Sequence, residues 1–328
     1  ALPIWIVEDG SFFVVGSKQE LQELAVEGWE EFEGKSPHRP WIDKIKIKHP
    51  ETGLVGERIL DVGNPWLDAG IVPFSTLKYN TDRDYWSQWF PGDFVTECFP
   101  GQFRNWFYSL LAMSAELEGK APFKTLLGHA LVKDETGRDM HKSWGNAIWF
   151  DDASEKMGVD VMRWMYSLQN IEQNLLFGYG PADEARKKLI TLWNVYSFYA
   201  TYAAVDGFNP SKNPLDVDDL NILDSWIIAK VNVLARDGRA SMDQFRVDEF
   251  MKSFEIFLEE LSNWYVRRNR RRFWKSEDDQ DKNSAYATLY YVLKNTITLI
   301  APVLPFISET IYQNLVVNSD SNAKESVH

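Results

Sequence analysis

Cysteine and long apolar runs are almost absent from this chain. The single cysteine, Cys98, excludes an intrachain disulfide and a metal site built from several cysteines. No apolar run approaches the ~20 residues that a membrane-spanning helix needs. The opening residues, ALPIWIVEDG, lack the basic and apolar regions of a signal peptide. We therefore expect a reducing, cytoplasmic setting and no membrane partner.

Positive charge is also scarce. The 35 Lys and Arg residues stand against 48 Asp and Glu residues, which gives a formal net charge of −13. This balance argues against broad, non-specific nucleic-acid binding but leaves room for a local basic patch. The hydrophobic fraction of 45%, with 20 Phe and 14 Trp, argues for sizeable cores and against disorder. The length predicts about two domains of roughly 150 residues each.

Residues 1–62 have the pattern of a small β-rich connective segment. Pairs of alternating apolar runs face each other across turn residues: 4–7 with 12–15 across Asp9-Gly10, and 44–48 with 58–62 across residues 51–53. The chain begins abruptly with strand-like residues, as if it were part of something longer.

The pattern changes from about Phe90 to strand, helix, strand, at residues 93–96, 102–116 and 125–132. Such alternation predicts a parallel, doubly wound sheet. Helical periodicity then continues to the end of the chain. The fold class that we predict is α/β followed by all-α, with an α/β part over residues 63–178, a helical domain over residues 179–317 and a disordered tail over residues 318–328.

Two stretches resemble the second half of the catalytic domain of class I aminoacyl-tRNA synthetases, most of all the isoleucyl-tRNA synthetases. They are FVTECFPGQFRNWFYSLLAMS (94–114) and FKTLLGHALVKDETGRDMHKSWGNAI (123–148). The resemblance covers nearly the whole chain. It implies a partial Rossmann-like catalytic half with a small β insert, then a helical-bundle anticodon-binding domain. It also implies ATP with Mg²⁺ as the substrate complex, adenylate formation and an isoleucine-specific tRNA as partner.

The stretch from Asp139 to Ser143 falls where that family has its mobile Lys-Met-Ser-Lys-Ser nucleotide loop. Adenylate formation needs positive charge on the pentavalent phosphate as it forms. The resemblance implies catalytic roles for Lys142 and Ser143. It puts Asp139 in the place of the first lysine, and this reversed charge weakens triphosphate binding unless Arg138 or His141 compensates. The alternative is an ordinary polar turn.

The resemblance implies two further groups of residues. The residues implied at the ATP or adenylate site are Glu97, Gln102, His129, Val132 and Met140, and those at the amino-acid pocket are Trp66, Asp68 and Trp106. The chemistry fits, because a carboxylate anchors an ammonium or a sugar hydroxyl and flat indoles grip a branched aliphatic chain. The alternative is structural: both tryptophans can be core or turn anchors, and His129 can make a structural hydrogen bond.

The segment LSNWYVRRNRRRFW (261–274) has five arginines in six positions. Arginine suits contacts with phosphates and base planes. The segment resembles one in the anticodon-binding domain of the isoleucine enzymes, which implies tRNA contacts for Arg267, Arg268, Arg271 and Arg272. The alternative is that some of these arginines pair with acidic residues of neighbouring helices.

The segment around Asp160 and Arg163 resembles the family helix that links the loop to the tRNA-binding half; these two residues can pair one helical turn apart. The family's cysteines are missing from the turn at residues 49–53, so we expect no protein-bound zinc.

The family's His-x-Gly-His signature is also missing, since none of the five histidines forms it. We therefore predict that the isolated chain makes no isoleucyl adenylate and that a missing N-terminal half can be its partner. Other interpretations stay open: a non-catalytic tRNA-binding or regulatory paralogue, or a ligase for valine, leucine or methionine. The Trp66 and Trp106 pair and the arginine segment favour isoleucine.

Overall fold

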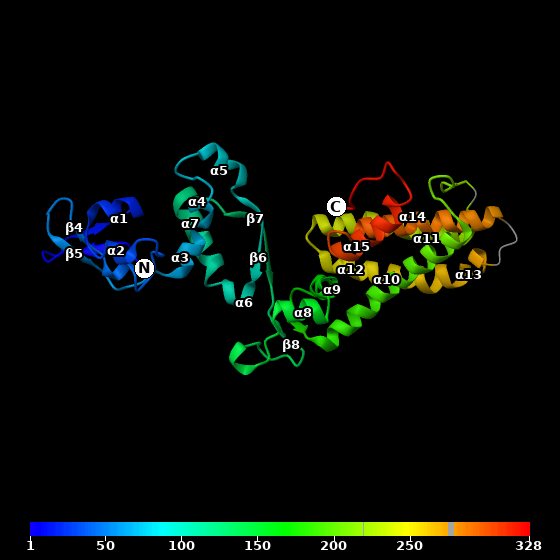
Figure 1. Cartoon of the computed structure of the whole chain (residues 1–328), viewed down its shortest axis with the longest axis horizontal. Coiled ribbons are helices and arrows are strands. Elements are labelled where there is room, and N and C mark those ends of the chain that lie inside the picture. The colour runs from blue at the N-terminus through cyan, green and yellow to red at the C-terminus, as the bar shows by residue number, and fades with distance from the viewer. Residues whose placement is uncertain (219, 275–278) are drawn as a thin grey trace. The chain divides into compact units, whose positions relative to one another are not determined.

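The computed structural model describes residues 1–218, 220–274 and 279–328 (Figure 1). The chain divides into two compact units, Ala1–Gly128 and His129–His328. The division falls inside the segment 63–178 that we predicted as the catalytic half. None of the helices in the described residues is long and apolar enough to cross a membrane.

A five-stranded antiparallel sheet begins the first unit, in the order β2-β1-β5-β4-β3. Its strands are β1 (Ile4–Ile6), β2 (Phe12–Val14), β3 (Ala25–Glu27), β4 (Lys46–Lys48) and β5 (Val55–Arg58), with α1 (Lys18–Leu24), α2 (Trp29–Phe32) and the short η1 (Ile42–Lys44) beside them. The Trp5 indole is buried and donates to the Ile45 carbonyl at 2.8 Å. The first predicted strand pair is confirmed. The second was misplaced, because β4 pairs with residues 55–57 of β5 and the predicted stretch 58–62 shares only Arg58 with that strand.

The rest of the first unit carries all three residues of the predicted amino-acid pocket. Its elements are α3 (Pro65–Gly70), α4 (Val72–Ser75), α5 (Arg83–Trp89), β6 (Gly92–Cys98), α6 (Phe99–Gln102), α7 (Trp106–Glu118) and β7 (Phe123–His129). Helix α3 packs against α7, and a Cβ on Gly70 would lie 2.6 Å from the carbonyl carbon of Ser109. Only glycine allows so close an approach of the two helices.

Strands β6 and β7 pair in a two-stranded sheet. The buried strand predicted for residues 125–132 is different in the structure, because β7 ends at His129 and none of its side chains is fully buried. The sheet has only two strands in the described part of the chain, so its faces are not covered and its side chains stay partly exposed.

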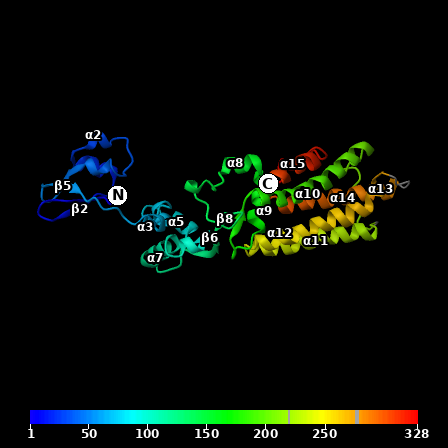
Figure 2. The ribbon, with the colours of Figure 1, turned by 90° about the horizontal axis from the view of Figure 1, so that it is seen from below.

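The second unit begins with β8 (Val132–Asp134), η2 (Lys142–Trp144), α8 (Phe150–Lys156), α9 (Val159–Leu168) and β9 (Leu175–Phe177). Strands β8 and β9 are parallel, with Val132 opposite Leu175. The long helices that follow lie side by side in both views (Figures 1 and 2). They are α10 (Tyr179–Asp206), α11 (Ile222–Asp243), α12 (Val247–Glu259) and α14 (Asp279–Ile300), joined by the π-helical η3 (Glu260–Val266) and α13 (Arg267–Trp274) and followed by α15 (Pro305–Tyr312) and the π-helical η4 (Gln313–Val317).

The bundle's core is aliphatic and aromatic, and its centre includes Leu192, Phe254, Leu261, Leu293 and Ile297, all with 0% exposure. Burial of such side chains is what stabilises helices that are amphipathic along their length. The helical domain predicted from periodicity is therefore present.

The polar tail differs from the predicted disordered segment. It folds back on α15, where the Ser326 hydroxyl and the Val327 N–H donate to one carboxylate oxygen of Glu309 at 2.9 and 3.0 Å. The Tyr312 hydroxyl also donates to the Lys324 carbonyl at 3.2 Å. Composition alone did not indicate these contacts, since each depends on an acceptor or donor presented by the neighbouring helix.

Candidate nucleotide and tRNA sites

Asp134, at the end of β8, organises the predicted nucleotide loop. Its Oδ1 accepts hydrogen bonds from the Thr136 hydroxyl at 2.7 Å and from the N–H groups of Thr136 and Arg138 at 3.0 and 2.9 Å. Its Oδ2 accepts from the Asn146 side-chain amide at 2.9 Å. The hydrogen bond from Thr136, followed by that from Asn146, holds the pKa of the Asp134 carboxyl far below its usual range.

Asn146 closes the loop from its other end. Besides the bond to Asp134, its Nδ2 donates to the carbonyl of Asp139 at 2.9 Å, and its Oδ1 accepts from the N–H of His141 at 3.0 Å. One amide therefore uses both donors and an acceptor within the loop. Gly137 and Gly145 have φ values of 87° and 72°, in the left-handed region that favours glycine.

The loop presents Lys142 and Ser143 on its exposed side, in η2. The Lys142 ammonium lies 4.5 Å from the centroid of the Trp149 ring. A cation over an exposed aromatic face is held by only ~0.5–1 kcal/mol, so a phosphate can draw it away. Met140, the third predicted residue of the loop, is half-buried.

Asp139 has a partner that sequence reasoning missed. The Lys133 ammonium lies 3.0 Å from Asp139 Oδ1. The two cations that we had considered are placed elsewhere: Arg138 lies against Asp134 at 3.3 Å, and the His141 ring meets the edge of Trp144. The reversed charge at position 139 is therefore compensated by Lys133, which lies on β8.

The predicted adenylate residues of the first unit, Glu97 and Gln102, are half-buried and partly used by the backbone. Glu97 Oε1 accepts from the N–H of Cys98 at 2.8 Å. Gln102 Oε1 accepts from the N–H of Trp106 at 3.1 Å, at the start of α7. The second carboxylate oxygen of Glu97 has no hydrogen bond in the described part of the chain.

The three predicted pocket residues come from two helices that pack together. Trp66 is half-buried and Asp68 exposed on α3. Trp106, which begins α7, donates its indole N–H to the Ala69 carbonyl of α3 at 3.1 Å. Trp106 thus holds the helix that carries the other two residues, which gives it a structural role whether or not its ring also faces a ligand.

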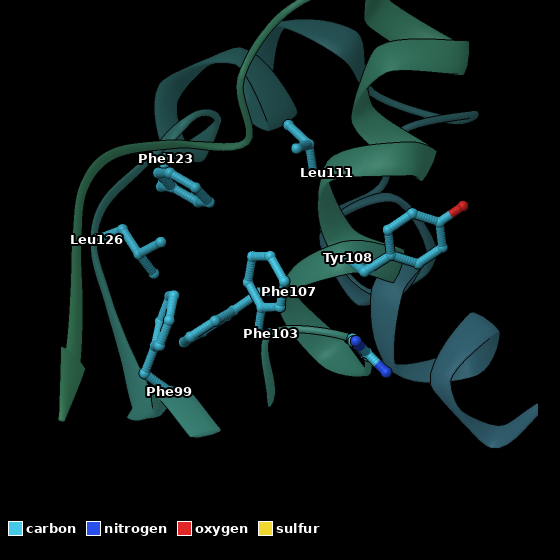
Figure 3. A pocket seen from close by; sticks show the side chains of 8 residues that line it. Phe99, Phe103, Phe107, Tyr108, Leu111, Phe123 and Leu126 are labelled. Carbon is cyan, nitrogen blue, oxygen red and sulfur yellow. The ribbon is translucent and has the colours of Figure 1, made fainter. Parts of the chain in front are cut away.

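An apolar pocket that the sequence did not predict lies on another face of α7, with a cavity volume of about 530 Å³. In Figure 3 the rings of Phe99, Phe103 and Phe107 gather opposite Phe123 and Leu126 of β7. Arg104, Tyr108 and Leu111 complete its lining. A sequence signal for this pocket does exist: a phenylalanine stands at every fourth position from 99 to 107, which is the spacing of residues on one face of a helix.

The remaining predicted adenylate residues, His129 and Val132, begin the second unit and are half-buried. His129 Nδ1 lies 2.7 Å from the carbonyl oxygen of the next residue, Ala130. Val132 is the first residue of β8, the strand that leads into the nucleotide loop.

The prediction that Arg272 contacts tRNA must be corrected. Its guanidinium makes a bidentate contact with Asp224 of α11, at 2.9 Å for each nitrogen, and its Nε donates to Asp281 of α14 at 2.9 Å. Asp224 has 0% exposure and also accepts from the Tyr265 hydroxyl at 2.6 Å. The side chain of Arg272 is therefore an internal tie between helices, as the alternative interpretation allowed.

Arg267, Arg268 and Arg271 are exposed. None of the three has an acidic partner in the described part of the chain. Their positions on one side of α13 form the basic patch that an acidic chain would need for tRNA.

Asp160 and Arg163 of α9 do not pair directly in the way we considered. Asp160 Oδ2 accepts from the N–H of Ile307 at 2.7 Å, at the start of α15. Arg163 donates to the carbonyls of Val303 and Pro302 at 2.6 and 2.9 Å. Arg163 thus binds the turn between α14 and α15, and Asp160 binds the first turn of α15. These hydrogen bonds connect α9 to the helical bundle.

Comparison with known proteins identifies the family. Residues 1–177 match the family described as tRNA synthetases class I (I, L, M and V), and residues 224–328 match the anticodon-binding domain of tRNA ligase. The first match spans more than half of the chain, and the chain belongs to the class I tRNA synthetase family.

Within that family the curated relatives are isoleucine–tRNA ligases. Those of Clostridium tetani and Clostridium novyi are each 40% identical to this chain, covering 100% of it and 31% of the relative. The enzyme of Methanothermobacter marburgensis is 38% identical with the same coverage. The chain therefore spans about a third of the length of these relatives.

The solved structures that resemble the chain support the fold. The LeuRS of Agrobacterium radiobacter K84, in a ternary complex with tRNA and LeuAMS, has a TM-score of 0.68 and 16% identity, over 99% of this chain and 39% of that one. The methionyl-tRNA synthetase of Mycobacterium tuberculosis with methionyl-adenylate has a TM-score of 0.62 and 18% identity, over 87% and 58%.

Proposed function

We propose that this chain is the later catalytic part and the anticodon-binding part of an isoleucine–tRNA ligase of the cytoplasm. The observation that carries the proposal is the loop closed by Asp134 and Asn146, which presents Lys142 and Ser143. The complete enzyme would form isoleucyl adenylate from isoleucine and ATP with Mg²⁺ and transfer the isoleucyl group to its tRNA. The similarity to isoleucine–tRNA ligases supports the choice of amino acid.

Lys142 would supply the positive charge that the phosphates need as the α-phosphate becomes pentavalent. Its ammonium rests on an exposed indole and has no acidic partner in the described residues, so little opposes its transfer to a phosphate. Ser143 would donate a hydrogen bond beside it. Asp139 would not repel the nucleotide strongly, because Lys133 compensates its charge.

The residues proposed around the adenylate are Glu97, Gln102, His129, Val132 and Met140, and those proposed around the isoleucine side chain are Trp66, Asp68 and Trp106. The hydrogen bond between Trp106 and α3 supports the second group, since it fixes the helix that carries Trp66. Selection in such a slot has limits, because one methylene is worth only ~1–3 kcal/mol.

The tRNA would bind along Arg267, Arg268 and Arg271, with Arg272 left out because it is an internal tie. These exposed guanidinium groups can neutralise phosphates, and binding would then weaken steeply with salt. A tRNA specific for isoleucine is the partner that this proposal names.

An N-terminal half of the nucleotide fold is the second partner. The apolar pocket lined by Phe99, Phe103, Phe107, Phe123 and Leu126 supports this, because its exposed rings would be stabilised by burial. We propose no protein-bound zinc for this chain. No group of three or more His, Cys, Asp or Glu residues that could hold a metal ion occurs in the described part of the chain.

The test is isoleucine-dependent exchange of pyrophosphate into ATP. The pure chain should show none, and adding a separately expressed N-terminal half that carries His-x-Gly-His should restore it. The restored exchange should be lost in Lys142→Ala and kept in Lys124→Ala, an exposed lysine that is paired with Asp93 at 2.6 Å. Exchange by the pure chain, or restored exchange that survives Lys142→Ala, would refute the proposal.

The second candidate is a non-catalytic tRNA-binding or regulatory paralogue, and the acidic residue at position 139 favours it. It predicts tRNA binding with no restored exchange under any of these conditions. Restored exchange would exclude it.

A further inference from the structure

An exposed tryptophan, Trp264, comes one helical turn before the run of arginines in the second unit. The run α12, η3 and α13 is continuous, and its inward side chains, Leu261, Tyr265 and Phe273, have 0% exposure. Trp264 faces outward with 52% of its surface exposed. A single exposed aromatic residue needs no explanation by itself, and its neighbours are what give this one meaning.

Arg268 lies one helical turn beyond Trp264 and covers part of it. The guanidinium carbon lies over the indole ring, 4.2 Å from its centroid, and we call this cation–π pair the Trp264–Arg268 stack. More than half of the indole remains exposed all the same. Arg267 and Arg271, also exposed, flank this stack on the same helix.

The helix beneath the stack is fixed in place. Arg272 ties α13 to Asp224 of α11, and Tyr265 ties η3 to the same carboxylate. The wide turn of a π-helix within an α-helix is itself frequent at functional sites. The helix that carries the exposed stack is therefore held in place, which limits the ordering entropy lost when a flat group binds to it.

We propose that the Trp264–Arg268 stack binds an unpaired base of the tRNA, while Arg267 and Arg271 contact the phosphates on either side. This inference rests on the proposed tRNA-binding function. RNA is the ligand that combines flat apolar rings with closely spaced negative charge, and bases stack on aromatic side chains and on guanidinium planes. A paired base is already stacked within its helix and cannot reach the indole, so the ligand is a single-stranded part of the tRNA.

The test compares two RNA probes of equal length and charge: a hairpin with an unpaired loop, and a fully paired duplex. Trp264→Ala should weaken hairpin binding about ten-fold or more, since one base–aromatic stack contributes that much. Trp264→Phe keeps a ring and should stay within about three-fold. Neither change should alter duplex binding. The matched control is Trp89→Ala, an indole with 57% exposure on α5 of the first unit.

Salt dependence separates stacking from charge. Arg268→Lys keeps the charge and should keep the salt dependence while losing affinity for the hairpin. Arg267→Gln and Arg271→Gln should each reduce the slope of log affinity against log salt by about one, for both probes. The control is Arg236→Gln, an exposed arginine of α11 placed about 18 Å along that helix from Asp224.

The stacking inference is overturned if Trp264→Ala binds the hairpin as the unchanged chain does, or if it loses affinity for the duplex equally. The proposed tRNA function can stand in that case, provided that Arg267→Gln and Arg271→Gln still weaken binding. If all the variants leave both affinity and salt slope unchanged, or the unchanged chain binds neither probe, both proposals fail and a protein partner becomes the better explanation of the exposed stack.

Discussion

Asn146 joins the two ends of the proposed nucleotide loop, because its side-chain amide donates to Asp134 Oδ2 at 2.9 Å across twelve positions of the sequence. The same amide holds the backbone of Asp139 and His141 in the middle of the loop. The exposed Lys142 is thus carried by a loop whose shape depends on one carboxylate and one amide.

Replacing Asn146 with Ala should therefore loosen the loop and leave the rest of the second unit unchanged. It leaves the Asp139 carbonyl and the His141 N–H without their partners, and an unmade hydrogen bond of this kind costs ~1–3 kcal/mol where water cannot replace it. We expect amide hydrogen exchange over residues 138–146 to be about ten-fold faster or more. Asn232→Ala, on the exposed side of α11, is the control. Equal rates of amide hydrogen exchange in the two variants would show that the hydrogen bonds of the Asn146 side chain do not hold the loop.

The loop should also respond to acid through Asp134. Folding lowers the pKa of this carboxyl below its usual value of 3.8, mainly through the hydrogen bonds from Thr136 and Asn146. The unfolded loop then binds the proton more readily, so the stabilisation is complete above the usual pKa and is lost as the pH falls through the folded one. The amide NMR signals of Thr136 and Arg138 should therefore titrate well below pH 3.8. A midpoint at the usual value would contradict this, and Asp134→Asn should abolish the titration.

Arg272 and Arg267 should differ sharply in their effect on stability although they belong to the same arginine run. Arg272→Gln removes the cation from the fully buried Asp224, and breaking a buried pair from one side costs ~3–5 kcal/mol. Arg267→Gln removes an exposed charge and should change the free energy of unfolding by less than ~0.5 kcal/mol. Urea denaturation of the two variants measures the difference. Equal midpoints would show that the Asp224 contact does not stabilise the bundle.

Trp106 should matter for the stability of the first unit as well as for any ligand. Trp106→Phe keeps an aromatic ring but removes the donor to the Ala69 carbonyl, which should cost ~1 kcal/mol. Trp89→Phe, at an exposed indole, should change the free energy of unfolding by less than ~0.5 kcal/mol. Thermal unfolding followed by circular dichroism compares the two. An unchanged midpoint for Trp106→Phe would remove its proposed structural role.

Sequence reasoning found the elements whose determinants are local. Hairpins around Asp9-Gly10 and residues 51–53 follow from turn residues between alternating strands, and the bundle helices follow from apolar spacing. It misplaced β5 and the end of β7, because the register of a strand is decided by its partner. It also missed the folded tail, whose anchor is Glu309 of α15.

The motifs at residues 94–114 and 123–148 and the arginine segment by themselves determined the family to which this chain belongs, since the residues of each motif lie close together along the sequence. Only the tertiary structure decided that Lys133 is the counter-ion of Asp139 and that Arg272 serves the fold while Arg268 faces outward on Trp264. The reason is tertiary: Arg268 and Arg272 lie one turn apart on the same helix, and their roles differ because the acidic partner of Arg272, Asp224, lies on another helix 48 positions away.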